Sequence, residues 1–318
     1  LVSLSISPDI IKRQSDMKIV YTPIHGTGYK LVPEALKAFG FTNIQTVKEQ
    51  LTPDGNFPTV VSPNPEEKAA LELALKLAKK VNADLILATD PDGDRVGVGV
   101  KDNNDNYILL NGNQSASLLI YYLIRQWKIK GKLTGKEFIA KTIVTSELLK
   151  DIAVSHGVES YDVLTGFKYI AEIIRRFEGQ KKFIGGGEES YGYLVGDFVR
   201  DKDAVAACAL LAETAAWARN MGMSMYEMLI NIYQEYGFYL EDLISITKKG
   251  KSGAEEIQAM MDGYRNSPPR EINSIPVEII KDYKLQKEFN LISGDEKPIE
   301  LPKSDVLQFF LKGGSKIT

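Results

Sequence analysis

Short apolar segments and amphipathic segments alternate along almost the whole chain, and this alternation constrains the fold more than any other feature. A strand-like run at 18–21 precedes a helix-like segment at 30–39 that ends at Gly40, and the same order recurs further on. Strands separated by helices pair in parallel, because each helix carries the chain back across the sheet. The sequence therefore predicts an α/β fold with two consecutive three-layer α/β/α domains, whose sheets are mixed and largely parallel, followed by an incomplete α+β domain.

Two changes of pattern divide the chain into three predicted domains. The run Asp-Asn-Asn-Asp-Asn at 102–106 is a strong turn signal, and beyond about Leu243 the order changes to strand, helix, strand, strand. We therefore expect domains at 1–106, 107–242 and 243–318. The main expected strands are 18–21, 44–47, 84–89, 96–100, 137–144, 159–164, 182–184, 276–281 and 306–312. The main expected helices are 30–39, 64–80 (with Asn64 as N-cap), 114–127, 146–155, 168–177, 203–220, 225–236 and 253–264.

The most informative loop is Asp90-Pro91-Asp92-Gly93-Asp94-Arg95, directly after the apolar run 84–89. Alternate residues of an extended segment project to the same side, so Asp90, Asp92 and Asp94 should converge. Carboxylates about 4 Å apart repel by roughly 4 kcal/mol per pair at an effective dielectric near 20, more than one arginine offsets. An all-oxygen ligand set is hard, and the loop therefore predicts a site for Mg²⁺, with Mn²⁺ or Ca²⁺ as less favoured alternatives and a polar turn as the non-functional one.

Two known loop types share part of this spacing. An EF-hand needs glycine at its sixth position and glutamate at its twelfth, but those positions, counted from Asp90, hold Arg95 and Lys101. Aspartyl-phosphate phosphatases of the HAD type also place Asp-x-Asp after an apolar strand, and Asp90 and Asp92 fit that start. Two positions after its second Asp, that class usually has Thr or Val, where this chain has Asp94. The HAD type therefore stays open as the alternative.

Three further segments carry candidate binding residues. The loop 185–192 follows a strand, and its three consecutive glycines at 185–187 let a ligand approach the backbone, while Glu188 and Ser190 offer an acceptor and a hydroxyl to a sugar. Thr165-Gly166-Phe167-Lys168 lies at a strand-to-helix junction, where open α/β sheets bind ligands and where a lysine suits phosphate. Lys141 stands inside an apolar strand, although lysine is rarely buried without a partner. His25-Gly26-Thr27-Gly28 favours a turn or capping role over catalysis.

Composition excludes several functional classes. A net charge of −3 gives no support for nucleic-acid binding, and one cysteine with two histidines leaves neither a disulfide framework nor a soft zinc cluster. The longest apolar run of small residues, 204–212, is too short to cross a membrane, so we expect a buried helix there and no membrane partner. These features are consistent with a cytoplasmic location. Because the chain starts with Leu1, we expect it to be a piece of a longer protein.

Taken together, the motifs resemble the α-D-phosphohexomutase superfamily. The metal loop at 90–95, Thr165-Gly166-Phe167-Lys168 and Gly187-Glu188-Glu189-Ser190 follow one another in that order and spacing. The similarity is strongest to the branch that holds bacterial phosphoglucomutase/phosphomannomutase and the phosphopentomutase-like enzymes, because of Gly186 to Tyr193. The resemblance covers nearly the whole chain, and it implies that these residues correspond to the second domain, the third domain and the start of the fourth.

The resemblance also implies a reaction and roles for individual residues. In the family a phosphoserine of the first domain transfers its phosphoryl group to a hexose phosphate, and the resulting hexose bisphosphate reorients and returns the other phosphate. By resemblance, Asp90, Asp92 and Asp94 would bind Mg²⁺, and Arg95 would lie beside the phosphoryl group. Lys168 would lie near the reacting oxygen. The substrate-binding residues would be Glu188, Ser190, Lys141, Thr165 and Gly166.

Two family motifs are missing from this sequence: the Thr-Ala-Ser-His-Asn-Pro type of serine loop and the Arg-Pro-Ser-Gly-Thr-Glu type of phosphate loop. We therefore expect residues 1–318 alone to be inactive and the intact protein to be the mutase. A HAD-type phosphatase and a metal-binding or sugar-binding module remain as alternatives from other classes. The sequence does not discriminate among glucose, mannose and pentose phosphates, and it does not define an oligomeric state.

Overall fold

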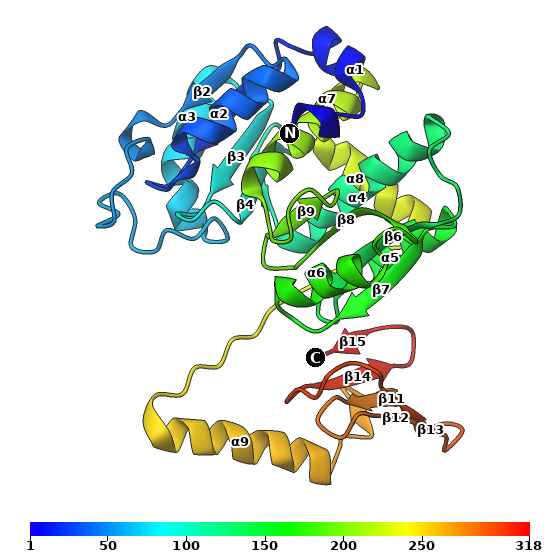
Figure 1. The fold of residues 1–318 in the computed structure, drawn as a ribbon. Coiled ribbons are helices and arrows are strands. Elements are labelled where there is room, and N and C mark those ends of the chain that lie inside the picture. The colour runs from blue at the N-terminus through cyan, green and yellow to red at the C-terminus, as the bar shows by residue number, and fades with distance from the viewer. The chain divides into compact units, whose positions relative to one another are not determined.

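Three sheets organise the chain, and the two that lie in the first part of the sequence share one hydrophobic core. The computed structural model describes residues 1–318, which divide into two units, Leu1–Glu241 and Asp242–Thr318 (Figure 1). The first unit holds two α/β sheets with their helices, and the second holds one helix and an antiparallel sheet. The predicted fold class is therefore confirmed.

The first sheet has the strand order β2-β1-β3-β4-β5. Its strands are β1 (Ile19–Thr22), β2 (Ile44–Thr46), β3 (Leu85–Thr89), β4 (Val96–Lys101) and β5 (Tyr107–Leu110). The pairs β1–β2 and β1–β3 are parallel, whereas β3–β4 and β4–β5 are antiparallel. Val20 and Ile86 lie in one core cluster, with helix α3 (Glu72–Val81), while Ile19, Tyr21 and Leu87 lie in another, with α2 (Gly28–Phe39). Successive residues of a strand therefore face opposite sides of the sheet, and helices cover both sides.

The second sheet has the order β7-β6-β8-β9 and is parallel except for its last pair. Its strands are β6 (Glu137–Thr142), β7 (Glu159–Val163), β8 (Lys182–Gly187) and β9 (Tyr193–Val195). Phe138 packs in a cluster with helix α6 (Phe167–Arg176), whereas the next residue, Ile139, belongs to the main core. That main core also includes α4 (Gly112–Ile129) and α5 (Leu148–Ser155).

Helix α7 (Ala204–Asn220) joins the two sheets of the first unit. Its side chains are almost all buried, and it packs against α2 and β3 as well as α4 and β9 (Figure 1). This confirms the buried helix expected from the apolar run of small residues. No helix of the chain combines the length and the apolar character that a membrane crossing requires. The remaining elements of this unit are α1 (Pro8–Arg13), α8 (Met225–Tyr236) and the short 3₁₀ helices Val2–Leu4, Lys48–Gln50 and Lys68–Leu71.

The second unit is an antiparallel sheet with the order β13-β12-β11-β14-β15, with β10 paired to β11 and α9 (Gly250–Asn266) preceding it. Its strands are β10 (Glu271–Ile272), β11 (Ile275–Asp282), β12 (Lys287–Asn290), β13 (Glu296–Pro298), β14 (Leu307–Leu311) and β15 (Lys316–Ile317). The Arg265 side chain of α9 is 8% exposed and pairs with Asp282 at 3.3 Å. This ion pair fixes the helix to the start of the turn after β11.

The helix predicted from residue 64 is wrong at its start. The Asn64 side chain accepts a hydrogen bond from the Glu66 N–H at 3.0 Å, and the Asn64 carbonyl accepts one from Glu67 at 3.0 Å, which makes a turn. The turn packs Pro65 against Gly97, where an added Cβ would lie 2.8 Å from the Pro65 oxygen. Regular helix therefore begins only at residue 72, after a 3₁₀ turn.

The expected boundary at residue 106 divides a hairpin. The turn 102–106 joins β4 to β5, and Lys101 pairs with Tyr107 in the first sheet. The Asn111 side chain then caps α4 by accepting a hydrogen bond from Gln114 N–H at 2.8 Å. We propose that the first domain ends at about residue 110. The two units of the structure meet between Glu241 and Asp242, and the division into three domains stays a prediction.

Candidate active site

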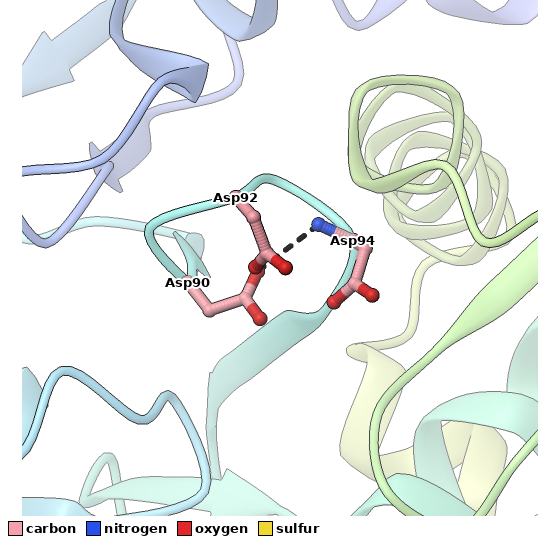
Figure 2. A group of neighbouring side chains, drawn as sticks. All are labelled: Asp90, Asp92 and Asp94. Atoms are coloured by element: carbon pink, nitrogen blue, oxygen red, sulfur yellow. Dashed lines mark hydrogen bonds between the residues drawn. The ribbon is translucent and has the colours of Figure 1, made fainter.

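The three aspartates of the loop after β3 converge, as the sequence predicts. Asp90, Asp92 and Asp94 each offer a carboxylate oxygen, and these oxygens lie within 4.8 Å of one another (Figure 2). Asp90 anchors the loop, because its Oδ1 accepts hydrogen bonds from the backbone N–H groups of Asp94 and Arg95, both at 3.0 Å. Gly93 takes a positive φ of 77°, which suits glycine at this turn.

The segment 25–28 supports this loop from the side. The Thr27 N–H and Thr27 hydroxyl both donate to the Pro91 carbonyl, at 2.8 and 3.0 Å. A Cβ on Gly26 would lie 2.5 Å from Pro91 Cα, so only glycine allows this close approach. His25 is buried and bonds through its two ring nitrogens to Thr52 and Thr59. The structure thus gives this segment the turn role that the sequence favours.

The donor set fits a hard divalent cation. One carboxylate oxygen, Asp94 Oδ1, is buried without a hydrogen-bond partner and lies 3.8 Å from the Arg95 Nε. Burial, the hydrogen bond with Asp94 and the charges of Asp94 and Asp92 together raise the pKa of Asp90 to about 7, although the backbone hydrogen bond from Arg95 opposes the rise. Three crowded oxygens, one of them unpartnered, are the arrangement that a divalent cation with oxygen ligands stabilises.

Arg95 and Lys202 place two cations at this loop. Arg95 Nη1 lies 3.0 Å from Glu66 Oε1, and Arg95 Nε lies 3.7 Å from Asp90 Oδ2. Lys202 Nζ lies 2.9 Å from Asp94 Oδ2, and the side chain is only 17% exposed. Burial alone would lower the pKa of Lys202, but the hydrogen bond with Asp94 and the nearby acids outweigh it and raise the pKa. Lys202 is therefore held as a cation.

Sequence reasoning missed Lys202. The residue stands directly before Asp203, whose side chain caps α7 through the N–H groups of Val205 and Ala206 at 2.9 and 3.1 Å. That capping motif is readable in the sequence and places Lys202 at the entry of a buried helix. Nothing local links it to residue 94, which lies in the loop between β3 and β4 of the first sheet.

The loop 187–192 meets the aspartate loop 90–95 through backbone contacts. Val96 N–H donates to the Tyr191 carbonyl at 2.9 Å, and Arg95 pairs with Gly192 in an isolated antiparallel bridge. Tyr191 adopts a φ of 67°, which is uncommon for a residue other than glycine. The second sheet thereby brings its glycine-rich loop to the aspartate loop of the first sheet. The two sequence motifs therefore lie side by side.

Glu188 and Glu189, although adjacent, have different surroundings. Glu188 is buried, and its Oε1 accepts a hydrogen bond from Gly166 N–H at 2.9 Å. Burial raises the pKa of Glu188, while the Gly166 N–H and the charge of Lys202 oppose the rise. The Glu189 carboxylate instead accepts hydrogen bonds from the hydroxyls of Thr142 and Thr145, both at 3.0 Å. Glu188 therefore links the loop to the 165–168 segment, and Glu189 fixes the loop to the end of β6.

The other predicted residues differ in how tightly they are held. Lys168 and Thr165 are exposed, Ser190 is half-buried, and Lys168 Nζ lies 4.9 Å from the Tyr169 ring centroid. Gly166 has a φ of 109° at the start of α6, a conformation that favours glycine. Lys141 is fully buried and forms ion pairs with Glu147 and Asp162, both at 3.0 Å. A substrate contact by Lys141 would require this arrangement to open.

The raised pKa of Asp90 gives a testable pH dependence. An acid whose pKa rises on folding, here from 3.8 to about 7, binds more protons in the folded chain between these values. The free energy of unfolding should therefore fall as pH rises through this range. We expect Asp90→Asn to remove this fall while keeping an oxygen that accepts the loop hydrogen bonds. Without metal, the variant should therefore gain stability relative to the unchanged chain as the pH rises from 4 to 7.

Denaturant titration at several pH values in the presence of a chelator would measure this difference. Added Mg²⁺ should reverse the trend, because the cation favours the charged carboxylate. A difference between the two chains that stays constant with pH would contradict the assignment.

Comparisons with known proteins extend these observations. Residues 5–103 match the family model for phosphoglucomutase/phosphomannomutase α/β/α domain II, and residues 111–236 match the model for α/β/α domain III. A phosphoglucomutase of Staphylococcus aureus (strain MRSA252) is 38% identical over 301 residues, which is 95% of this chain and 54% of that protein. A phosphoglucomutase of Staphylococcus haemolyticus is 37% identical over the same shares. The chain thus spans about half the length of the curated relatives it matches.

Solved structures show the same fold at lower sequence identity. The phosphoprotein pp63/parafusin of Paramecium, a phosphoglucomutase, aligns with a TM-score of 0.63 at 15% identity, covering 99% of this chain and 51% of that one. A phosphoglucomutase/phosphomannomutase family protein of Burkholderia thailandensis aligns with a TM-score of 0.52 at 20% identity, covering 71% and 46%. Both similarities concern the fold.

Proposed function

Since the chain belongs to the α-D-phosphohexomutase superfamily, which includes phosphoglucomutase and phosphomannomutase, we propose that it forms part of a Mg²⁺-dependent mutase. The intact enzyme would interconvert hexose 1-phosphate and hexose 6-phosphate through an enzyme phosphoserine and a hexose bisphosphate. Phosphohexomutases are in general metal-dependent. One observation carries the proposal: the aspartate loop and the glycine-rich loop, from different sheets, meet through the Val96–Tyr191 hydrogen bond of 2.9 Å.

The site residues divide into two functional groups. Asp90, Asp92 and Asp94 would hold the cation, which when bound neutralises charge on a phosphoryl group. Arg95 lies on the same loop, where its guanidinium can stabilise negative charge on that group. Lys202 keeps Asp94 in place through the ion pair of 2.9 Å. This chain thereby supplies the electrostatic part of phosphoryl transfer, and we assign the nucleophile to a serine outside residues 1–318.

The sugar-binding group lies on the second sheet. Glu188 is held by the Gly166 N–H at 2.9 Å, which leaves its second oxygen to accept sugar hydroxyls. Ser190 stands two residues further along the same loop and can add a hydroxyl contact. Thr165 and Gly166 complete the proposed substrate-binding set, which Lys141 would join only when its ion pairs with Glu147 and Asp162 open. Lys168 lies at the same junction as Thr165 and Gly166 and is a candidate proton carrier. The cytoplasmic location expected from the sequence stays a prediction.

A coupled assay of glucose 1-phosphate conversion would test the proposal. The full-length protein, supplied with Mg²⁺ and a bisphosphate primer, should produce glucose 6-phosphate. Residues 1–318 alone should convert none, because the family nucleophile is not among them. Phosphate release by residues 1–318, with a beryllofluoride adduct at Asp90, would instead support the HAD-type phosphatase. Binding of metal or sugar with no turnover in the full-length protein would support the binding module.

The two neighbouring glutamates offer a matched pair of variants. We expect Glu188→Ala in the full-length protein to lower kcat/KM at least tenfold, because each hydrogen bond from a sugar hydroxyl to a charged acceptor contributes about 1.5–3 kcal/mol. Glu189→Ala removes the acceptor of two threonine hydroxyls and should chiefly lower the thermal midpoint. Steady-state kinetics and thermal unfolding of both variants separate the two effects. If Glu188→Ala had unaltered kinetics and Glu189→Ala lost kcat, the sugar contact would have to be assigned to Glu189 and not to Glu188.

A further inference from the structure

A lysine-rich depression lies at the edge of the second sheet opposite the candidate active site. The strands β6 and β8 run parallel, and the active-site loops follow their carboxyl ends. Lys136 precedes β6 and Lys182 begins β8, so both mark the amino ends of these strands, and Lys182 N–H donates to the Lys136 carbonyl at 2.9 Å. A depression of about 610 Å³ opens between these residues and Trp127 at the end of α4. We call it the lysine depression.

The charge in the lysine depression is strongly positive. Four lysines line it, at positions 132, 136, 181 and 182, together with one acid, Glu137. That acid is 3% exposed and already accepts hydrogen bonds from the Thr134 hydroxyl at 2.7 Å and from the N–H groups of Thr134 and Gly135. Lys181 pairs with Glu159 at 2.6 Å, but Lys132, Lys136 and Lys182 are exposed and form no ion pair. Three lysines therefore face the depression without an ion pair, and the one acid among the lining residues, Glu137, is already bound by hydroxyl and backbone N–H groups.

The Trp127 ring lies close to two of these ammonium groups. The Nζ atoms of Lys132 and Lys182 lie 5.9 and 5.6 Å from the Trp127 ring centroid, within the range of cation–π interaction. The ring holds the ammonium groups in place, while their N–H bonds remain available to an acceptor. The two ammonium groups repel each other because both lie near the same ring, and an anion bound between them would relieve this repulsion.

The walls leave room for a ligand of small size. Gly131, Gly135 and Gly179 line three turns with φ of 64°, 88° and 72°, and a Cβ at any of them would have no atom within 4 Å. The chain as a whole carries a net charge of −3, which does not favour a long nucleic acid. A phosphate ester carries about −1.5 to −2 charges at neutral pH, so two phosphate groups would balance three lysines.

We propose that the lysine depression binds a small molecule with two phosphate groups, away from the active site and independently of the proposed function. Sugar bisphosphates and nucleoside diphosphates share this chemistry. Pyrophosphate is the simplest probe, and fructose 1,6-bisphosphate and ADP distinguish the two sources. Trp127 is the reporter, since the other tryptophan, Trp217, is only 7% exposed on α7.

The test is a titration of the chain with pyrophosphate, followed by tryptophan fluorescence and by calorimetry in the presence of a chelator. We expect saturable binding whose dissociation constant rises at least tenfold in a Lys136→Ala/Lys182→Ala double variant. A Lys79→Ala/Lys80→Ala double variant removes two exposed lysines of α3 and should bind like the unchanged chain. Circular dichroism would confirm that both variants fold.

Three outcomes would overturn the proposal. The first is no saturable binding of pyrophosphate, fructose 1,6-bisphosphate or ADP up to about 10 mM, a concentration at which even a ligand of millimolar affinity would bind. The second is an equal loss of binding in the two double variants, which would indicate attraction by overall charge. The third is a short oligonucleotide that binds more tightly than every diphosphate and depends on Lys136 and Lys182, since the occupant would then be nucleic acid.

Discussion

Asp92→Asn is expected to weaken Mg²⁺ binding to residues 1–318 at least tenfold and to lower the kcat of the full-length protein by about 10²–10³-fold. Asp92 is the most informative of the three aspartates because its side chain is exposed, whereas Asp90 holds the loop backbone and Asp94 pairs with Lys202. The substitution removes one anionic oxygen and leaves the hydrogen bonds of the loop unchanged.

Calorimetric titration with Mg²⁺ and steady-state kinetics would measure the two effects. Asp105→Asn is a suitable control, because Asp105 lies in the exposed turn between β4 and β5 and already has a φ of 61°, which asparagine tolerates. Mg²⁺ binding that is the same in Asp92→Asn as in the unchanged chain would remove the metal assignment.

Lys168→Met in the full-length protein is expected to lower kcat by about 10²–10⁴-fold, the usual effect of losing a general acid or base. Lys168→Arg should be nearly as damaging with KM little changed, because arginine keeps the positive charge but cannot give up its proton. The structure leaves Lys168 exposed beside Tyr169, so its amine can reach a substrate. An arginine variant that keeps most of its kcat would make Lys168 an electrostatic anchor only.

Lys202 provides the matched comparison for Lys168. Its ammonium is held at 2.9 Å from Asp94 Oδ2, and we propose that it acts through its charge. Lys202→Arg should therefore keep a kcat close to that of the unchanged protein. Lys202→Met should lose most of its kcat. If the two lysines behaved in the opposite way, with arginine accepted at 168 and rejected at 202, Lys202 would be the proton carrier.

The sequence predicts most strands and helices of the first unit because their apolar residues are contiguous or periodic. The missed strands β5 and β9 are short, and each pairs antiparallel with a neighbour in the chain, so turn residues dominate their local pattern. The false helix start at Asn64 has a tertiary cause. Glu66 contacts Arg95 at 3.0 Å, and this ion pair favours a turn where local capping preferences favour a helix.

The candidate site was predictable only where its geometry is local. The convergence of Asp90, Asp92 and Asp94 follows from their spacing along one segment, and the structure confirms it. The contact between Lys202 and Asp94 joins residues more than a hundred positions apart and depends on the packing of α7 between two sheets. Spacing carries no information about such a contact, so the sequence could not supply it.

The backbone bridge between Arg95 and Gly192 has a consequence for protein engineering. Because main-chain atoms form it, its register depends on the number of residues in each loop more than on their side chains. A chimaera that takes the first sheet from one mutase and the second from another should keep the bridge only when both loops retain their lengths. Under the proposed function, changes of sugar preference are therefore better sought at the exposed Thr165 and the half-buried Ser190, where side chains can vary without moving the bridge.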